Sequence, residues 1–171
     1  MKYLSATIAA LALASLSVQA QDKTQEFVEK VSVSNSFEIA SSELALERAQ
    51  SPAVRQFAQH MVEDHGKAAE DLKAAVEKSE LGVGVRDTLD DKHAEMMQEL
   101  GDATGAQFDQ KYVEMQMAAH DEAVKLFEQY ASHAASEDAS SSLRQFAEKT
   151  LPVLKQHDRH IEQLSRQVAN L

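Results

Sequence analysis

The sequence contains no cysteine among its 171 residues. Disulfide bonds are therefore impossible, and no thiolate is available to bind a metal ion or to carry a lipid anchor. The fold must be held together by its hydrophobic core, and any metal site must use histidine, methionine, aspartate or glutamate as ligands.

Glycine and proline are also scarce, with five and two residues respectively, whereas Ala, Glu, Gln, Lys and Leu are abundant. This composition favours helix throughout, and no segment shows the alternation of polar and apolar residues that is typical of a half-buried strand. The formal net charge of −11 repels nucleic acid and anionic lipid, and it also contributes to solubility. We therefore expect an all-α protein that does not bind nucleic acid.

The first twenty residues have the features of a secretory signal peptide. Lys2 precedes an apolar run from Leu4 to Leu16, and small residues lead to a predicted cleavage site after Ala20. The run is too short for a comfortable membrane span, and no later stretch approaches the roughly 20 apolar residues that a span needs. The sequence predicts an exported, periplasmic or envelope-associated protein without a transmembrane segment, in which residues 21–171 form a single domain.

Apolar residues at helical spacing divide this domain into four long helices and one short connecting helix. The expected ranges are 22–49, 52–80, 86–100, 107–134 and 142–170. Ser51 and Pro52 mark a helix start, whereas Gly82 and Gly84 mark a helix end. Because the link between the first two helices is short, they should form an antiparallel hairpin. A four-helix bundle is the expected architecture.

Each long helix places one residue that can bind metal near the middle of its core-facing stripe. These residues are Glu38, His65, His120 and His157. Glu38 lies 13 residues before Ser51 and His65 lies 14 after it, so the hairpin brings them to one level. Similar counts place His120 and His157 within three residues of a common level, which is about 4.5 Å of helix rise. The four side chains should converge.

A lone buried histidine is more often hydrogen-bonded than metal-bound. Three histidines and a glutamate at one depth favour metal, because satisfying all of them with protein partners alone is demanding. These ligands suit one transition-metal ion, namely Zn, Fe, Mn or Cu, and an incomplete shell would leave room for water or substrate.

Several further residues are candidates to flank such a site. Each of the three histidines has an adjacent acid that is able to orient an imidazole, most naturally one on another helix, although these acids are equally explained as solvated surface groups. They are Asp64, Asp121 and Asp158.

The remaining candidates also have two interpretations each. Met61 and Met117 lie close to the histidines and would favour copper, but methionine on such a stripe usually fills the core. Tyr112 is either a redox-active neighbour or a core tyrosine with a bonded hydroxyl group. His160 follows His157 by three residues on a shifted row and could flank the site.

With these residues in place, residues 24–164 resemble an uncharacterised family of exported bacterial proteins, a domain of unknown function often labelled "predicted outer membrane protein" within the ferritin-like superfamily. The resemblance is carried by four motifs. They are "FEIA" with Glu38, "FAQHMVEDHGKAAEDL" with Asp64 and His65, "GAQFDQKYVEMQMAAH" with Asp109, Tyr112 and His120, and "LPVLKQH" with Pro152 and His157. The resemblance implies a ferritin-like bundle in the periplasm or envelope, and no settled activity.

The sequence departs from classical di-iron ferritin-like proteins, which use Glu-x-x-His pairs. Met117 and Leu154 occupy the positions three residues before His120 and His157, and no Glu-x-x-His occurs. A single-metal site is therefore expected instead of a ferroxidase centre. Two functions remain open. The first is an exported metal-binding protein that could be redox-active. The second is a non-enzymatic envelope-stress or interaction protein whose buried polar cluster fixes helix register without metal.

Overall fold

Four long helices and one short helix make up the structure, a computed structural model that describes the backbone of residues 6–133 and 141–169 and the side chains of residues 22–132 and 141–169. The helices are α1 (Ala6–Arg48), α2 (Pro52–Ser79), α3 (Asp91–Asp102), α4 (Ala106–His133) and α5 (Ser141–Val168). The described residues contain no strand. The predicted all-α bundle with a short connecting helix is confirmed.

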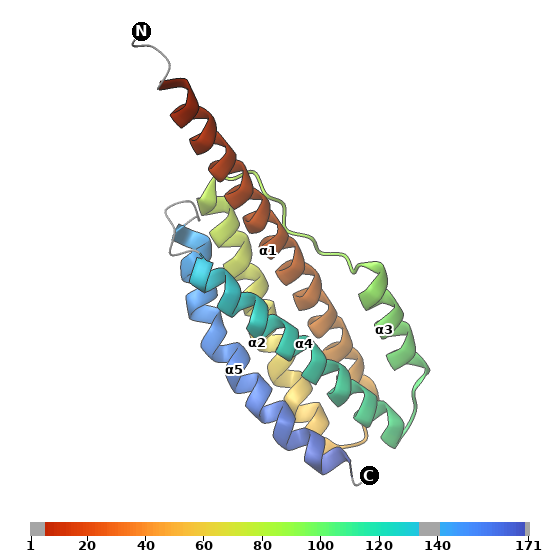
Figure 1. Cartoon of the computed structure of the whole chain (residues 1–171). Helices are drawn as coiled ribbons and strands as arrows, with labels where there is room; N and C mark the ends of the chain where they lie inside the picture. Colours follow the sequence, from red (N-terminus) through yellow and green to blue (C-terminus); the bar gives the residue numbers. More distant parts are fainter. Residues whose placement is uncertain (1–5, 134–140, 170–171) are drawn as a thin grey trace.

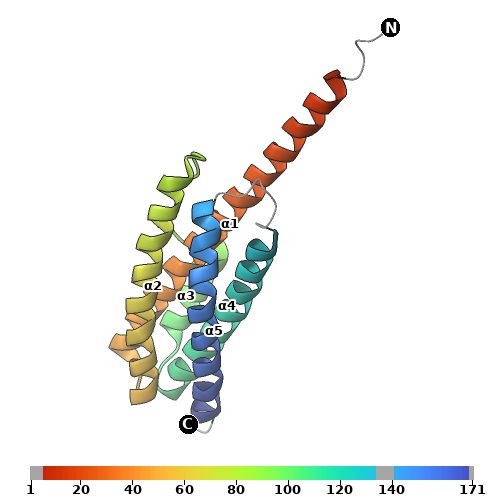
Figure 2. The same cartoon turned by 90° about the vertical axis from the view of Figure 1, so that its left-hand side faces the viewer.

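The bundle consists of two antiparallel hairpins, α1 with α2 and α4 with α5, that pack side by side (Figures 1 and 2). Helix α1 also contacts α4, and α2 also contacts α5, so each long helix touches two neighbours. Helix α3 lies outside this group and packs against α1 and α4. No helix in the described part of the chain is long and apolar enough to cross a membrane.

Two helix boundaries differ from the predicted ones by more than two residues. Helix α1 begins at Ala6 instead of residue 22, because the Ala- and Leu-rich start has high helix propensity, and it projects beyond the other helices (Figure 1). Helix α3 begins at Asp91 instead of Arg86, because the side chain of Asp90 accepts a hydrogen bond from the backbone of His93 and caps the helix there. The predicted turn before α5 lies largely outside the described residues.

Helix α2 begins at Pro52 as predicted, but the cap is supplied by another helix. The Ser51 side chain makes no capping hydrogen bond. Instead, the fully buried Asp109 of α4 accepts hydrogen bonds from the backbone amides of Gln50 at 3.0 Å and Ser51 at 2.7 Å. Two amide groups that the α1–α2 turn leaves unpaired are thereby satisfied, and the second hairpin is fixed against the first.

The hydrophobic core has two halves. One half contains Phe57, Phe108 and Leu164, and the other contains Phe27, Leu72 and Leu143. Along every long helix, the residues of one half precede those of the other, and a gap separates them. The gaps in α2, α4 and α5 hold His65, His120 and His157, and Glu38 directly follows Phe37 at the edge of the gap in α1.

Candidate metal centre

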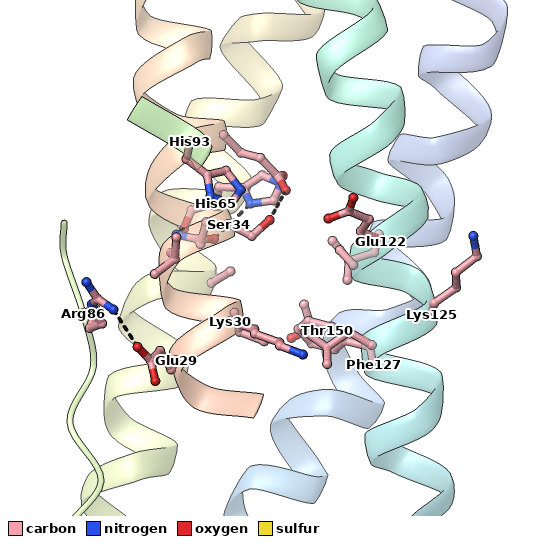
Figure 3. A pocket seen from close by; sticks show the side chains of 18 of the residues that line it. Glu29, Lys30, Ser34, His65, Arg86, His93, Glu122, Lys125, Phe127 and Thr150 are labelled. Atoms are coloured by element: carbon pink, nitrogen blue, oxygen red, sulfur yellow. Dashed lines mark hydrogen bonds and ion pairs between the residues drawn. The ribbon is translucent and has the colours of Figure 1, made fainter. Parts of the chain in front are cut away.

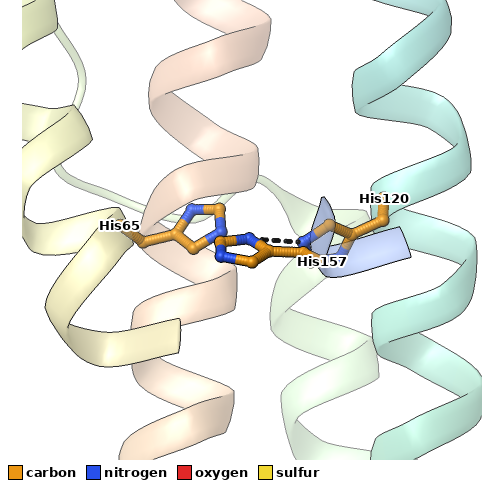
Figure 4. A group of neighbouring side chains, drawn as sticks. All are labelled: His65, His120 and His157. Atoms are coloured by element: carbon orange, nitrogen blue, oxygen red, sulfur yellow. Dashed lines mark hydrogen bonds between the residues drawn. The ribbon is translucent and has the colours of Figure 1, made fainter. Parts of the chain in front are cut away.

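Four side chains from four different helices meet between the two halves of the core. Glu38 comes from α1, His65 from α2, His120 from α4 and His157 from α5, and their exposed fractions are 1, 5, 0 and 6%. The three imidazole rings approach one another (Figure 4), and one ring nitrogen from each lies within 4.8 Å of the others. We call these four residues the His/Glu cluster.

The inward-facing atoms of the cluster are close to one another. Oε2 of Glu38 lies 2.8 Å from Nε2 of His65 and 3.7 Å from Nε2 of His120. Nε2 of His120 lies 3.4 Å from Nδ1 of His157. The other carboxylate oxygen of Glu38, Oε1, accepts a hydrogen bond of 3.0 Å from the hydroxyl group of Ser34. Glu38 is thus oriented from one side and presents Oε2 to the rings.

The second nitrogen of each ring contacts an oxygen atom outside the cluster. The three contacts are His65 Nδ1 with Asn35 Oδ1 at 2.9 Å, His120 Nδ1 with the Gln116 carbonyl at 2.9 Å, and His157 Nε2 with Asp64 Oδ2 at 2.8 Å. The side-chain NH₂ group of Asn35 donates a hydrogen bond to the backbone carbonyl of His65, and this orients Oδ1 of Asn35 towards the His65 ring. A neutral imidazole carries one proton, and these acceptors place it on the outer nitrogen. The inner nitrogen of each neutral ring therefore carries a lone pair.

Two atoms inside the cluster have no hydrogen-bond partner among the described residues. They are Glu38 Oε2 and His65 Nε2, which lie 2.8 Å apart and form an ion pair when His65 is protonated, whereas no proton lies between them when His65 is neutral with its proton on Nδ1. Buried polar atoms in folded proteins are nearly always paired. The centre of the cluster is consequently a place where lone pairs gather without a donor.

Electrostatics keep Glu38 ionised and His157 neutral. Burial raises the pKa of Glu38, but attraction to His65 and His120 in their protonated form, together with side-chain hydrogen bonds, outweighs burial and lowers the pKa from 4.5 to about 2. Burial lowers the pKa of His157 from 6.5 to about 4, and repulsion from the other two rings adds to this, whereas Asp64 opposes it. At neutral pH, Glu38 is a carboxylate and His157 is a neutral imidazole.

A cavity of about 610 Å³ reaches the cluster. Glu38, His65 and His157 line it, together with apolar side chains such as Phe127 (Figure 3). The rim is charged but balanced, since Arg86 forms an ion pair with Glu29 and Lys92 forms one with Glu122. A volume of this size admits a small molecule. Water or a small ligand can therefore reach the edge of the cluster, whose inner atoms Glu38 Oε2 and His65 Nε2 are themselves buried.

The structure brings only one of the three flanking acids to the cluster. Asp64 on α2 contacts His157 on α5, across helices, whereas Asp121 is exposed and forms an ion pair with Lys125. Asp158 lies along a separate groove between α4 and α5.

The flanking methionines and tyrosine belong to the core. Met61 is fully buried in the hydrophobic half that contains Phe57, and Met117 packs against the same half. Tyr112 is buried, and its hydroxyl group lies 2.9 Å from the Ser42 hydroxyl, while burial raises its pKa. These contacts match the core-filling alternatives for all three residues.

His160 is exposed on α5, and its ring lies 5.1 Å from the ring of the buried Phe57. It does not reach the inner atoms of the cluster, although it shares a small pocket with His157 and Asp64.

Two residues that hold the cluster were not identified from the sequence. Asn35 and Ser34 lie on α1 shortly before Glu38. Asn35 contacts His65, and Ser34 donates a hydrogen bond to Glu38. Ser34 and Glu38 are four residues apart, a spacing that predicts contact on a helix. No local pattern signals the contact of Asn35, because it depends on how α1 and α2 pack. The acceptor for His120 is a backbone carbonyl, which has no sequence signal at all.

The comparisons with known proteins show the family and the helical fold of the chain. A family described as "Domain of unknown function (DUF4142)" matches residues 10–164. The chain belongs to the DUF4142 family. No curated protein matches this DUF4142 chain. It is similar to the crystal structure of a DUF305 fragment from Deinococcus radiodurans, with a TM-score of 0.67, 16% identity, and coverage of 87% of this chain and 97% of that one. Both families are domains of unknown function, and the likeness shows the helical fold alone.

Proposed function

We propose that this DUF4142 protein binds one transition-metal ion at the His/Glu cluster. The observation that carries the proposal is the arrangement of protons and lone pairs. Each outer ring nitrogen contacts an oxygen acceptor, and the inner nitrogens face one another and the Glu38 carboxylate. Neutral rings placed in this way have no proton to share. A cation at the centre would pair with all four groups at once.

The spacing of the inner atoms supports the same proposal. Two ligands bound to one ion at about 2.1 Å, with angles of 90 to 110°, lie about 3.0 to 3.4 Å apart. Three contacts in the cluster measure 2.8, 3.4 and 3.7 Å, and the three ring nitrogens lie within 4.8 Å of one another. An ion would draw the rings together by about 1 Å, which rotations of the side chains can supply.

The ligand set narrows the choice of ion to those that accept imidazole and carboxylate, which are Zn, Fe, Mn and Cu. Sulfur ligation gains no support, because the contacts of Met61 and Met117 are with the hydrophobic core. Zinc would be saturated by three nitrogens and one oxygen. Iron and manganese accept more ligands, and the added positions would face the cavity, where a small molecule could bind a redox-active ion.

We also propose that the protein is exported and acts in the periplasm or envelope, as the first twenty residues indicate. A ferritin-like ancestry is proposed for the bundle, with a single ion in place of a di-iron centre. The absence of Glu-x-x-His supports this difference.

A second candidate is a protein that uses the cluster without metal, as a fixed polar layer for an interaction role. The 3.4 Å separation of His120 Nε2 and His157 Nδ1 favours it, because one extra proton placed between these nitrogens would form a hydrogen bond. The resulting positive charge would pair with Glu38. This alternative requires a proton where the first proposal requires a metal ion.

Metal analysis separates the two candidates. Protein exported and purified without chelator should contain about one ion per chain, and His120→Ala should contain almost none. The control is His93→Ala, which removes a histidine that is hydrogen-bonded to Asp90 outside the cluster. Chelator-treated protein is then titrated with Zn, Mn, Fe and Cu by calorimetry. Failure of all four ions to bind the folded wild-type protein at the cluster would overturn the proposal in favour of the metal-free role.

A further inference from the structure

A second pocket, of about 260 Å³, lies between α2 and α5 and shares Asp64 and His157 with the cavity. Two exposed histidines line it, His60 from α2 and His160 from α5. Neither belongs to the His/Glu cluster, and the proposed function uses neither of them.

Helix geometry gathers metal-binding groups around this pocket. His60 and Asp64 are four residues apart on α2, and His157 and His160 are three residues apart on α5, so each pair lies on one helix face. The two helices pack against each other. The rings of His60 and His160 are 6.4 Å apart between centroids, and they come from opposite walls.

We propose that His60, His160 and Asp64 form a second site for a divalent transition-metal cation, which we call the outer site. With nitrogen–metal bonds of about 2.1 Å and angles of 90 to 110°, two imidazoles that share one ion have centroids about 4.6 to 5.3 Å apart. The observed 6.4 Å is about 1 Å longer, so the two rings would have to approach each other to share an ion. Both rings are exposed, so small side-chain rotations can bring them closer without disturbing the core.

Two neighbours prepare the ligands of the outer site. The edge-to-face contact of His160 with the buried ring of Phe57 restricts the orientation of the imidazole. The side chain of Asp64 is 50% exposed and gives one oxygen to His157. Because a carboxylate has about four lone-pair positions, that hydrogen bond leaves it able to bind a cation as well.

Arg159 also lines the pocket, and its positive charge opposes a cation. Its side chain is exposed, so water screens the repulsion and the site can still bind a cation. Because Arg159→Gln removes this positive charge, it should strengthen zinc binding at the outer site. An anion site would respond in the opposite way, because it would lose its main charged donor.

Zinc titration of the whole protein by calorimetry tests the outer site. The wild type should show two classes of binding, and His60→Ala/His160→Ala should lose the weaker class while keeping one equivalent at the His/Glu cluster. The matched control is Gln59→Ala/Glu162→Ala, which changes two exposed residues on the same helices and should keep both classes. Because His60 and His160 are exposed, their removal should leave the helical content of the zinc-free protein unchanged and lower its melting temperature only slightly, through the lost contact of His160 with Phe57.

The result that overturns the outer site is an identical zinc stoichiometry in the wild type and in His60→Ala/His160→Ala. Loss of the weaker binding class in the control Gln59→Ala/Glu162→Ala would also overturn the outer site. So would weaker zinc binding in Arg159→Gln. The outer site and the proposed function fail separately. His120→Ala should remove only the tight class, and a wild type that binds zinc solely through His60 and His160 would refute the buried centre and support the outer one.

Discussion

Loading the His/Glu cluster with a metal ion should raise the melting temperature of the wild-type protein but not that of His157→Ala. An ion that binds only the folded state at 100 times its dissociation constant adds about 2.7 kcal/mol to the free energy of unfolding. For a domain of this size, 1 kcal/mol corresponds to about 2 to 4 °C. The expected increase is therefore about 5 to 11 °C.

His157 is a suitable residue to change because it lies at the edge of the cluster. Its side chain is 8% exposed, and its partner Asp64 is half-exposed, so water can replace the lost hydrogen bond to the acid. Removal of the ring in the metal-free protein should cost about 1 to 3 kcal/mol, as for other buried hydrogen-bonded groups. The variant should still fold, and it lacks one of the four proposed ligands.

The assay is a set of four melts followed by circular dichroism, wild type and variant, each with chelator and with metal. The exposed Gln156, next along α5, provides the control Gln156→Ala, which should behave as the wild type does. An equal metal-dependent shift in the wild type and in His157→Ala, for every ion tested, would refute metal binding at the cluster. In that case the destabilisation by the variant would reflect a hydrogen-bond network alone.

Three further outcomes are expected. Asp64→Asn should lower the metal affinity of the cluster about 10- to 100-fold in calorimetry by weakening the orientation of His157, whereas Asp121→Asn should leave it unchanged, since Asp121 lies in a surface ion pair. The pKa of His157 falls from 6.5 to about 4 on folding, so the unfolded chain binds more protons between these values. The contribution of this pKa shift to the free energy of unfolding is fully present above pH 6.5 and is lost as the pH falls towards 4, by about 3 kcal/mol at most. Urea unfolding of metal-free His157→Gln should lack this component of the pH dependence. Asp109→Ala should cost about 2 to 4 kcal/mol in urea unfolding, because two backbone amides lose a charged acceptor, and an effect below 1 kcal/mol would contradict that role.

Much of the bundle follows from local sequence signals. The start of α2 at Pro52 was predicted correctly because proline acts on the backbone directly, whereas the end of α2 at Ser79 precedes Gly82 by three residues, since Glu80 adopts the left-handed conformation that ends the helix. The predicted start of α3 was wrong by five residues, since the N-cap Asp90 fixes the start at Asp91. Such a cap competes with an apolar pattern that continues on both sides of it.

The positions of the cluster residues were predictable for a different reason. A repeat of three and four residues fixes which side of a helix faces the core, and residue counts from a turn fix the level along the bundle. Neither count fixes how far each helix rotates about its own axis. Asp64 precedes His65 whereas Asp121 follows His120, so the two acids lie on opposite sides of their histidines, and the rotation of each helix decides that Asp64 contacts His157 while Asp121 faces solvent. It also decides the shape of the cavity, which no pattern in the sequence indicates.

The location of the His/Glu cluster itself argues for binding over simple stability. Both halves of the core are apolar, and a layer of leucine and valine between them would join the halves without any polar group to satisfy. The chain instead places a polar residue from every long helix at this level, supplies an oxygen acceptor for the outer nitrogen of each ring, and leaves the inner atoms of Glu38 and His65 without a hydrogen bond. A layer that only fixed helix register would be expected to pair its atoms with one another. Orientation from outside, with unpaired atoms at the centre, is the arrangement that a bound cation requires.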